Sequence, residues 1–241
     1  IVQSENTGAE RLSPLESDKI EQAFQDGLSL HQSGKIPEAQ HAYRDILKAR
    51  PDHALTLNYF GLSLFQAGDP EGAANLIAKA VRYAPQDDDT IKAVFLNNLG
   101  SAYGALRKAD EAVECFRRAL EIDPNFLLAL DNLGNAMINE DQLDEAVACF
   151  KRMIEIDPGD ESAYCKLASS LIDRGELDDG LQCLREALVT NPDFIVVRGN
   201  LGVALNERGE HDEAQTASQC DRDTLKVEEV LKEEGSCAFS R

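Results

Sequence analysis

The sequence repeats itself at an interval of about 34 residues, and this period constrains the fold more than any other feature. Five prolines, aligned with one another, bring the rest of the chain into register: Pro51, Pro85, Pro124, Pro158 and Pro192. The alignment defines five units, at 20–53, 54–87, 93–126, 127–160 and 161–194. A partial sixth unit begins at Ile195 and loses the pattern after Ala214. Units this short cannot bury their apolar side chains alone, so neighbouring units are expected to stack.

Each unit carries two apolar stripes at helical spacing. In unit 93–126 the first stripe consists of Leu96, Leu99 and Tyr103, and the second of Ala112, Phe116, Ala119 and Leu120. These spacings are typical of two amphipathic helices, and the recurrent proline ends the second helix because it cannot continue one. Each unit is therefore predicted to be an antiparallel hairpin of a first and a second helix, and the whole chain to be all-α.

Small residues recur at fixed places in both helices. The first helices contain Gly27, Gly61, Gly100, Gly134 and Gly202, although glycine there costs about 1 kcal/mol relative to alanine. The facing places on the second helices hold Ala39, Ala73, Ala112, Ala146 and Ala214. We therefore expect Gly134 to lie where the two helices of its unit approach most closely, opposite Ala146.

The unit at 93–126 shows the pattern that identifies the repeat. Leu99, Gly100 and Tyr103 are followed by Ala112 and Phe116, and then by the proline, which gives L-G-x-x-Y, A-x-x-x-F and P. The chain thus resembles the tetratricopeptide repeat family over residues 20 to about 214. The resemblance implies a right-handed α-solenoid of stacked antiparallel helical hairpins at 20–214. A polar segment at 1–19, with the start of the first helix, would precede it, and a capping helix and tail at 215–241 would follow.

Three segments outside the repeat have their own signals. Ser13-Pro14-Leu15-Glu16 predicts the start of a helix that runs to about His31. Residues 88–92 are inserted before the third unit and predict an N-cap and a longer first helix. They are either a simple insertion or an acidic ridge for a basic partner. Residues 223–234 read as the helix that caps the solenoid.

The charge balance restricts the partners. The formal net charge is −20, and a polyanion of this size is repelled by nucleic acids and by anionic membrane surfaces. A partner with a basic segment would be attracted. The sequence has no run of apolar residues long enough to span a bilayer, so we expect no membrane insertion.

Neither the acidic pairs nor the cysteines predict a catalytic or metal site. The acidic pairs are Asp110-Glu111, Asp144-Glu145, Asp178-Asp179 and Asp212-Glu213, each in the first turn of a second helix. Carboxylates there oppose the positive end of the helix dipole. Cys115, Cys149 and Cys183 lie 34 residues apart, so stacked helices would hold them too far apart for a disulfide. Reduced thiols suggest a cytoplasmic protein. Since nucleotide, metalloprotease and hydrolase motifs are missing, we expect neither an enzyme nor a cofactor.

The candidate binding residues lie on the first helices. In the resembled family, the inner face of these helices binds extended peptides. The sixth place of the repeat holds Asn98, Asn132, Lys166 and Asn200, and the ninth place holds Ser101, Asn135 and Ser169. Asn58 and Asn97 stand at neighbouring inward places. Because an Asn amide both donates and accepts hydrogen bonds, such a row could hold a peptide backbone, or it could merely solvate the face.

These features leave several functions open. The row resembles the asparagine ladder in O-linked N-acetylglucosamine transferases, although Lys166 interrupts it. No Lys stands at the inward places that bind acidic chaperone tails in a related subfamily, so that partner is disfavoured. The leading hypothesis is a non-catalytic scaffold that binds a basic, extended protein segment in its concave groove. The alternatives are the recognition region of a larger glycosyltransferase or sulfotransferase, and a structural subunit of an assembly.

Overall fold

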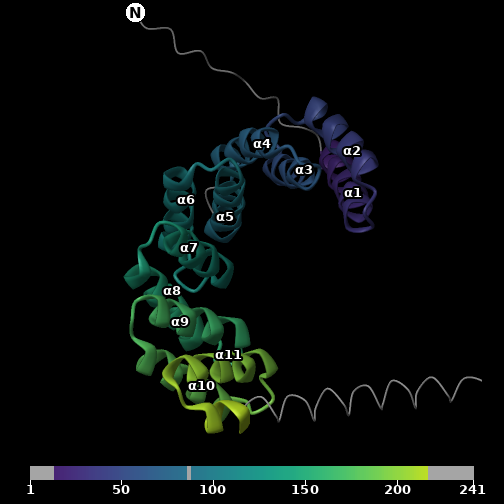
Figure 1. Ribbon diagram of the computed structural model, residues 1–241. Coiled ribbons are helices and arrows are strands. Elements are labelled where there is room, and N and C mark those ends of the chain that lie inside the picture. The colour runs from purple at the N-terminus through teal and green to yellow at the C-terminus, as the bar shows by residue number, and fades with distance from the viewer. Residues whose placement is uncertain (1–13, 86–87, 217–241) are drawn as a thin grey trace, which may run out of the picture. The chain divides into compact units, whose positions relative to one another are not determined.

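The fold consists of antiparallel helical hairpins (Figure 1). The computed structural model describes residues 14–85 and 88–216, and these contain no strand. The helices are α1 (Pro14–Gln32), α2 (Ile36–Ala49), α3 (Ala54–Gln66), α4 (Pro70–Tyr83), α5 (Asp89–Ala105), α6 (Ala109–Ile122), α7 (Leu127–Asn139), α8 (Leu143–Ile156), α9 (Glu161–Asp173), α10 (Leu177–Thr190) and α11 (Ile195–Arg208). Residues 211–216 are again helical. The predicted capping helix at 223–234 lies outside the described residues.

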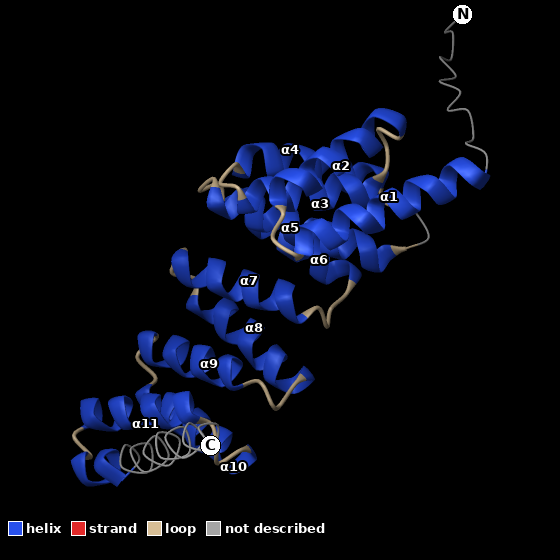
Figure 2. Cartoon of the chain, turned by 90° about the vertical axis from the view of Figure 1, so that its right-hand side faces the viewer, coloured by secondary structure: helices blue, strands red, loops and turns tan. Residues whose placement is uncertain are grey.

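The chain divides into two compact units, residues 1–122 and 123–241. In the first unit, α1 to α6 form three hairpins, and α2 and α4 each pack against the first helix of the next hairpin. In the second unit, α7 and α8 form one hairpin and α9 and α10 another, and α10 packs on α11 (Figure 2). Each hairpin therefore buries its apolar stripes against its neighbours, as the repeat requires.

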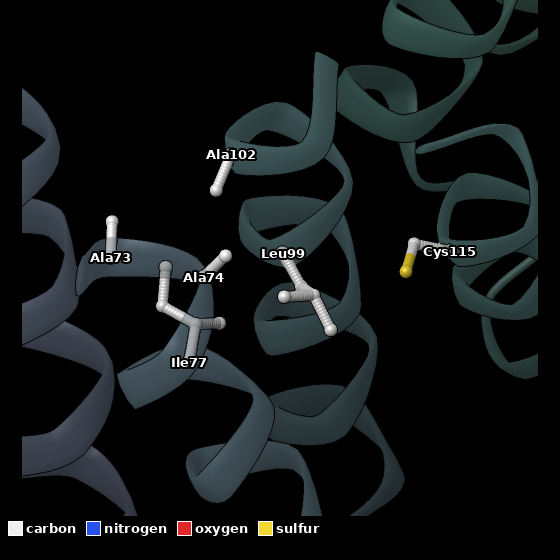
Figure 3. Close-up of a cluster of buried hydrophobic side chains, with 6 residues drawn as sticks. All are labelled: Ala73, Ala74, Ile77, Leu99, Ala102 and Cys115. Carbon is white, nitrogen blue, oxygen red and sulfur yellow. The ribbon is translucent and has the colours of Figure 1, made fainter. Parts of the chain in front are cut away.

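A buried cluster in the first unit shows how consecutive repeats are joined (Figure 3). Ala73, Ala74 and Ile77 of α4 face Leu99 and Ala102 of α5, and Cys115 of α6 completes the cluster. Small alanines let α4 and α5 approach closely, while the larger side chains fill the space between them. The second helix of one repeat thus supports the first helix of the next, which is the helix that carries the candidate binding residues.

Two predicted helix starts are confirmed. Helix α1 begins at Pro14. The side chain of Asp88 accepts a hydrogen bond from the backbone N–H of Ile91 at 3.0 Å, so it caps α5. With its cap supplied by the insertion, α5 has 17 residues, whereas α3 has 13.

The acidic pairs do more than oppose helix dipoles. Asp144 and Asp178 lie in first turns, as predicted. Arg174 donates to Asp144 at 2.6 Å, and Arg208 donates to Asp178 at 2.6 Å. Arg174 directly follows α9 and Arg208 is the last residue of α11, and each reaches back to the second helix of the preceding repeat. The same ion pair therefore recurs one repeat later, which the dipole argument alone did not predict.

Two further carboxylates cap first helices in the second unit. Asp160 accepts hydrogen bonds from the backbone N–H groups of Ser162 and Ala163, at the start of its own helix α9. Glu161, in α9, accepts hydrogen bonds from Val196 and Val197 at the start of α11, at 2.7 and 3.2 Å. The start of α11 is thus capped by a side chain from the repeat before it.

The close helix contact predicted at Gly134 is confirmed. The atoms nearest to a Cβ added there belong to the ring of Phe150 and to the Cβ of Cys149 rather than to Ala146. The physical reason is that a residue without a side chain leaves a dent in the helix surface, and a large ring fills it. Gly100 likewise lies against Phe116.

The turn between the two helices of a hairpin contains a left-handed residue. Gly34, Gly68, Gly175 and Gly209 have φ between 77° and 89°. In the third and fourth repeats the left-handed residues are Arg107 (φ 59°) and Asp141 (φ 58°). A side chain in this region costs about 1–2 kcal/mol, less for Asp.

Replacing Arg107 with Gly is therefore expected to stabilise the first unit. The relief of left-handed strain exceeds the extra backbone entropy of glycine in the unfolded chain, so we expect a gain of about 0.5–1 kcal/mol. Urea unfolding followed by circular dichroism measures it. Gly68→Ala is the matched opposite change and should destabilise the unit, because Gly68 has the same left-handed turn conformation. A Cβ added there would meet nothing within 4 Å, so backbone strain alone would cause the loss. A less stable Arg107→Gly protein would contradict the strain argument.

The structure also shows the state of the cysteines and whether any helix could span a membrane. Among the described residues, Cys115, Cys149 and Cys183 are buried and Cys165 is half-buried, and none of the four is in a disulfide. No helix in the described part of the chain is long and apolar enough to cross a membrane.

Candidate functional site

Neighbouring first helices lie side by side within each unit, and the candidate residues stand along these contacts. In the first unit α3 contacts both α1 and α5, and in the second unit α9 contacts α11. The face that the first helices form in each unit is called here the first-helix face. The predicted residues differ in how far their side chains are exposed on this face.

Asn58 and Asn98 are joined across two first helices. The Nδ2 of Asn98 in α5 donates to the Oδ1 of Asn58 in α3 at 3.0 Å. Asn58 is only 2% exposed and Asn97 only 5%. Both lie behind the surface, where Asn58 and the backbone of Asn97 accept hydrogen bonds from half-buried Asn98 and Ser101. Ser101 donates to the backbone carbonyl of Asn97 at 3.1 Å.

In the second unit, Lys166 is neutralised by a carboxylate. Its Nζ donates to Oδ1 of Asp131, on the preceding first helix, and lies 5.9 Å from the centre of the Phe150 ring. Asn135 donates to the other oxygen of Asp131 at 3.1 Å. The lysine that interrupts the asparagine row therefore brings no net charge to the face. Asn132, half-buried on the same helix, stands next to Asp131.

A groove lies between α9 and α11 and contains two of the predicted residues. It has a volume of about 170 Å³. Its lining residues are Ala168, Ser169, Ile172, Asp173, Leu184, Asn200, Val203, Ala204 and Glu207. Asn200 also hydrogen-bonds the half-buried thiol of Cys165; burial raises the pKa of that thiol and the hydrogen bond opposes the rise. The structure thus brings Ser169 and Asn200 together at one groove.

A second groove, between α1 and α3, was not predicted. It has a volume of about 390 Å³ and is lined by Leu28, His31, Gln32, Tyr59, Leu62, Phe65 and Gln66. His31 is one of these lining residues, with Nε2 at 3.0 Å from Oε1 of Gln66 and Nδ1 at 3.4 Å from the hydroxyl of Tyr43. Repeat position could have found it. Tyr59 stands at the sixth place of its unit and Leu28 and Leu62 at the ninth, the places from which the asparagine row was chosen.

A groove of about 500 Å³ lies elsewhere, between α8, α9 and α10. It contains none of the predicted residues. Tyr164, Leu167 and Leu171 form its base and are almost fully buried. Arg174 at its rim is bound by Asp144 and Glu176. Lys151, Glu155 and Glu186 of its lining are exposed, so this groove is open to solvent. Within the described residues, no group of three or more His, Cys, Asp or Glu side chains could hold a metal ion.

The comparison with protein families decides the identity. Models of the tetratricopeptide repeat match residues 24–88, 93–126, 127–160 and 165–218. The chain belongs to the tetratricopeptide repeat family. No curated protein matches this tetratricopeptide repeat chain in sequence.

Solved structures share its fold. A crystal structure of the MamA protein is 23% identical, with a TM-score of 0.64, and the alignment covers 73% of this chain and 93% of that one. MamA from Desulfovibrio magneticus RS-1, from residue 41 to its end, is 20% identical with a TM-score of 0.60, covering 72% and 96%. YrrB, described as a TPR protein with an unusual peptide-binding site, is 21% identical with a TM-score of 0.59, covering 73% and 88%. The predicted all-α solenoid of tetratricopeptide hairpins is confirmed.

Proposed function

We propose that the protein is a non-catalytic scaffold that binds an extended, basic segment of another protein along its first-helix face. The observation that carries this proposal is the groove between α9 and α11, where Ser169 and Asn200 stand beside exposed apolar and acidic side chains. Hydroxyl and amide groups can pair with a peptide backbone whatever its sequence. The peptide-binding site of YrrB, a protein of the same fold, lends support.

The net charge of the protein determines which kind of protein segment it attracts. With a net charge of −20, the protein attracts basic segments and speeds their approach, an effect that salt screens. The same charge opposes binding to nucleic acids. We place the protein in the cytoplasm, where its buried thiols remain reduced.

The test replaces three amides of the face. Changing Asn98, Asn132 and Asn200 together to Ala should weaken binding at least about tenfold, since each lost hydrogen bond is worth about 0.5–1.5 kcal/mol. The probe is a basic peptide selected on the wild-type protein from a random peptide library, titrated by calorimetry. Helicity and melting are followed in parallel, because Asn98 also donates to buried Asn58.

The matched control changes three amides outside the first helices. Asn75 in α4, Gln182 in α10 and Gln215 are all exposed, so replacing them with Ala should leave affinity unchanged. Equal affinities for the wild type and the first-helix triple variant would show that the asparagine row only solvates its face, and would overturn the proposal.

A further inference from the structure

The groove between α9 and α11 has a shape that suits one unbranched side chain. Its floor is formed by Ala168, Leu184 and Ala204, which are 1%, 1% and 2% exposed. Two of these three are alanines, so the floor lies deep between the helices. The volume of about 170 Å³ equals that of about six water molecules in the liquid. Half-buried Ile172 and exposed Val203 form the apolar walls.

The charge of this groove is not compensated. Asp173 and Glu207 occupy the thirteenth place of α9 and of α11, so one carboxylate comes from each helix. Both are exposed, and neither has an ion pair or hydrogen bond within the described residues. Other carboxylates of this unit do have a cationic partner: Asp131, Asp144, Glu176, Asp178, Glu210 and Glu213. The groove therefore presents two free negative charges above an apolar floor.

We propose that this groove takes a lysine or arginine side chain of the bound segment, and this inference rests on the proposed function. The aliphatic stem lies along Ile172 and Val203, and the cation is held by Asp173 and Glu207. Long basic side chains bury their stems on apolar surface while the charged end stays at the rim. An aliphatic side chain would fill the floor but leave both carboxylates without a cation. Ser169 and Asn200, on the same lining, are placed to bind the backbone beside that residue.

The groove between α1 and α3 differs from the α9–α11 groove in its charge. It uses the same repeat places, with Leu28 and Leu62 at the ninth and Gln32 and Gln66 at the thirteenth. No carboxylate, lysine or arginine lines it. The preference for a basic side chain therefore belongs to the residues of the α9–α11 groove and not to first-helix grooves in general.

The experiment is a double-mutant cycle between protein and peptide. Peptides are selected from a random library on the full chain, and the basic residue of the best peptide is replaced by norleucine, which keeps the stem and removes the charge. On the protein, Asp173→Asn and Glu207→Gln are combined. Partly exposed ion pairs contribute little individually, so we expect norleucine to weaken binding to the wild type about fivefold. The double variant should bind both peptides equally.

The control protein combines Asp193→Asn and Glu121→Gln. Both carboxylates are exposed and lie outside the groove. The control variant and the groove variant each lose two negative charges, so their net charges are equal. It should retain the full preference for the basic peptide. If the control loses that preference to the same extent, the effect is long-range attraction and the groove assignment is overturned.

Other outcomes separate this inference from the function on which it rests. Selected peptides without Lys or Arg, or a norleucine penalty that is equal in the wild type and the groove variant, would overturn the basic pocket and leave segment binding intact. Failure to select any peptide would overturn both.

Discussion

Replacing Gly134 with Leu is expected to lower the free energy of unfolding of the second unit by about 3 kcal/mol, the upper part of the range for overpacked cores. Even a Cβ at this position would lie 2.6 Å from Cε1 and 2.7 Å from Cζ of Phe150. Phe150 is fully buried, so its ring has no free space to enter. The helices α7 and α8 must therefore separate or the ring must leave its rotamer, and either change lowers stability.

Two variants show whether the contact with the ring is the cause. In Gly134→Ala, the additional change Phe150→Leu removes the atoms that clash and should restore part of the stability. Gly104→Ala is the control, because Gly104 is exposed in α5 and a Cβ there meets nothing within 4 Å. Urea unfolding followed by circular dichroism compares the wild type with Gly134→Leu, Gly134→Ala, the double variant and Gly104→Ala. A Gly134→Leu protein with the stability of the wild type would mean that the hairpin contact is placed incorrectly.

The second large effect is a loss of stability in alkali. Burial raises the pKa of the Cys115 thiol to about 11 and that of the Cys183 thiol to about 12, whereas an unfolded cysteine titrates near 8.5. Above pH 8.5 the unfolded chain releases these protons and the folded chain keeps them. Stability is therefore constant below about pH 8.5 and falls as the pH rises toward 11, by about 1.4 kcal/mol per pH unit for each thiol.

One of these thiols lies in each compact unit, so each unit should lose about 2 kcal/mol between pH 8.5 and pH 10. Burial raises the pKa of Tyr43 to about 12, so the tyrosine contributes only above pH 10. Urea unfolding at about pH 8 and about pH 10 measures the loss. Cys115→Ala should remove the alkaline dependence of the first unit up to about pH 10, and Cys183→Ala should reduce that of the second unit, where the raised pKa of Cys165 also contributes. Unchanged dependence in both variants would exclude the thiols as its source.

The helices could be predicted from the sequence because each depends on local signals. The start of α1 at Pro14 and the longer α5 follow from capping residues and from an insertion, which act within one turn. The contact of Gly134 was predicted in part. Ala146 and Phe150 are four residues apart and share a helix face, so periodicity cannot show which of them fills the dent.

The candidate site was less predictable, because side-chain pairing depends on distances that no repeat pattern contains. Repeat position placed Asn98, Asn132 and Lys166 at equivalent sites. It could not show that Asn98 binds Asn58 or that Lys166 is held by Asp131. The predicted site was a row of amide side chains. The groove beside Tyr59 is lined mostly by other residues, so it was not predicted.

One ion pair and one helix cap of the second unit are placed so that they could form again after the loss of a whole repeat. If residues 161–194 were excised, Arg208 would take the place of its counterpart one repeat earlier and could pair with Asp144. Asp160 would then precede α11 directly, where its carboxylate could bind the two backbone amides that Glu161 binds now. A deletion of one whole period would thus restore the ion pair of Asp144 and the cap of α11, but Asp131 would lose Lys166, because the equivalent residue one repeat later is Asn200. Contacts that recur at the repeat interval let the length of such a scaffold change in steps of one hairpin, which gives the chain a simple route to fit shorter or longer partners.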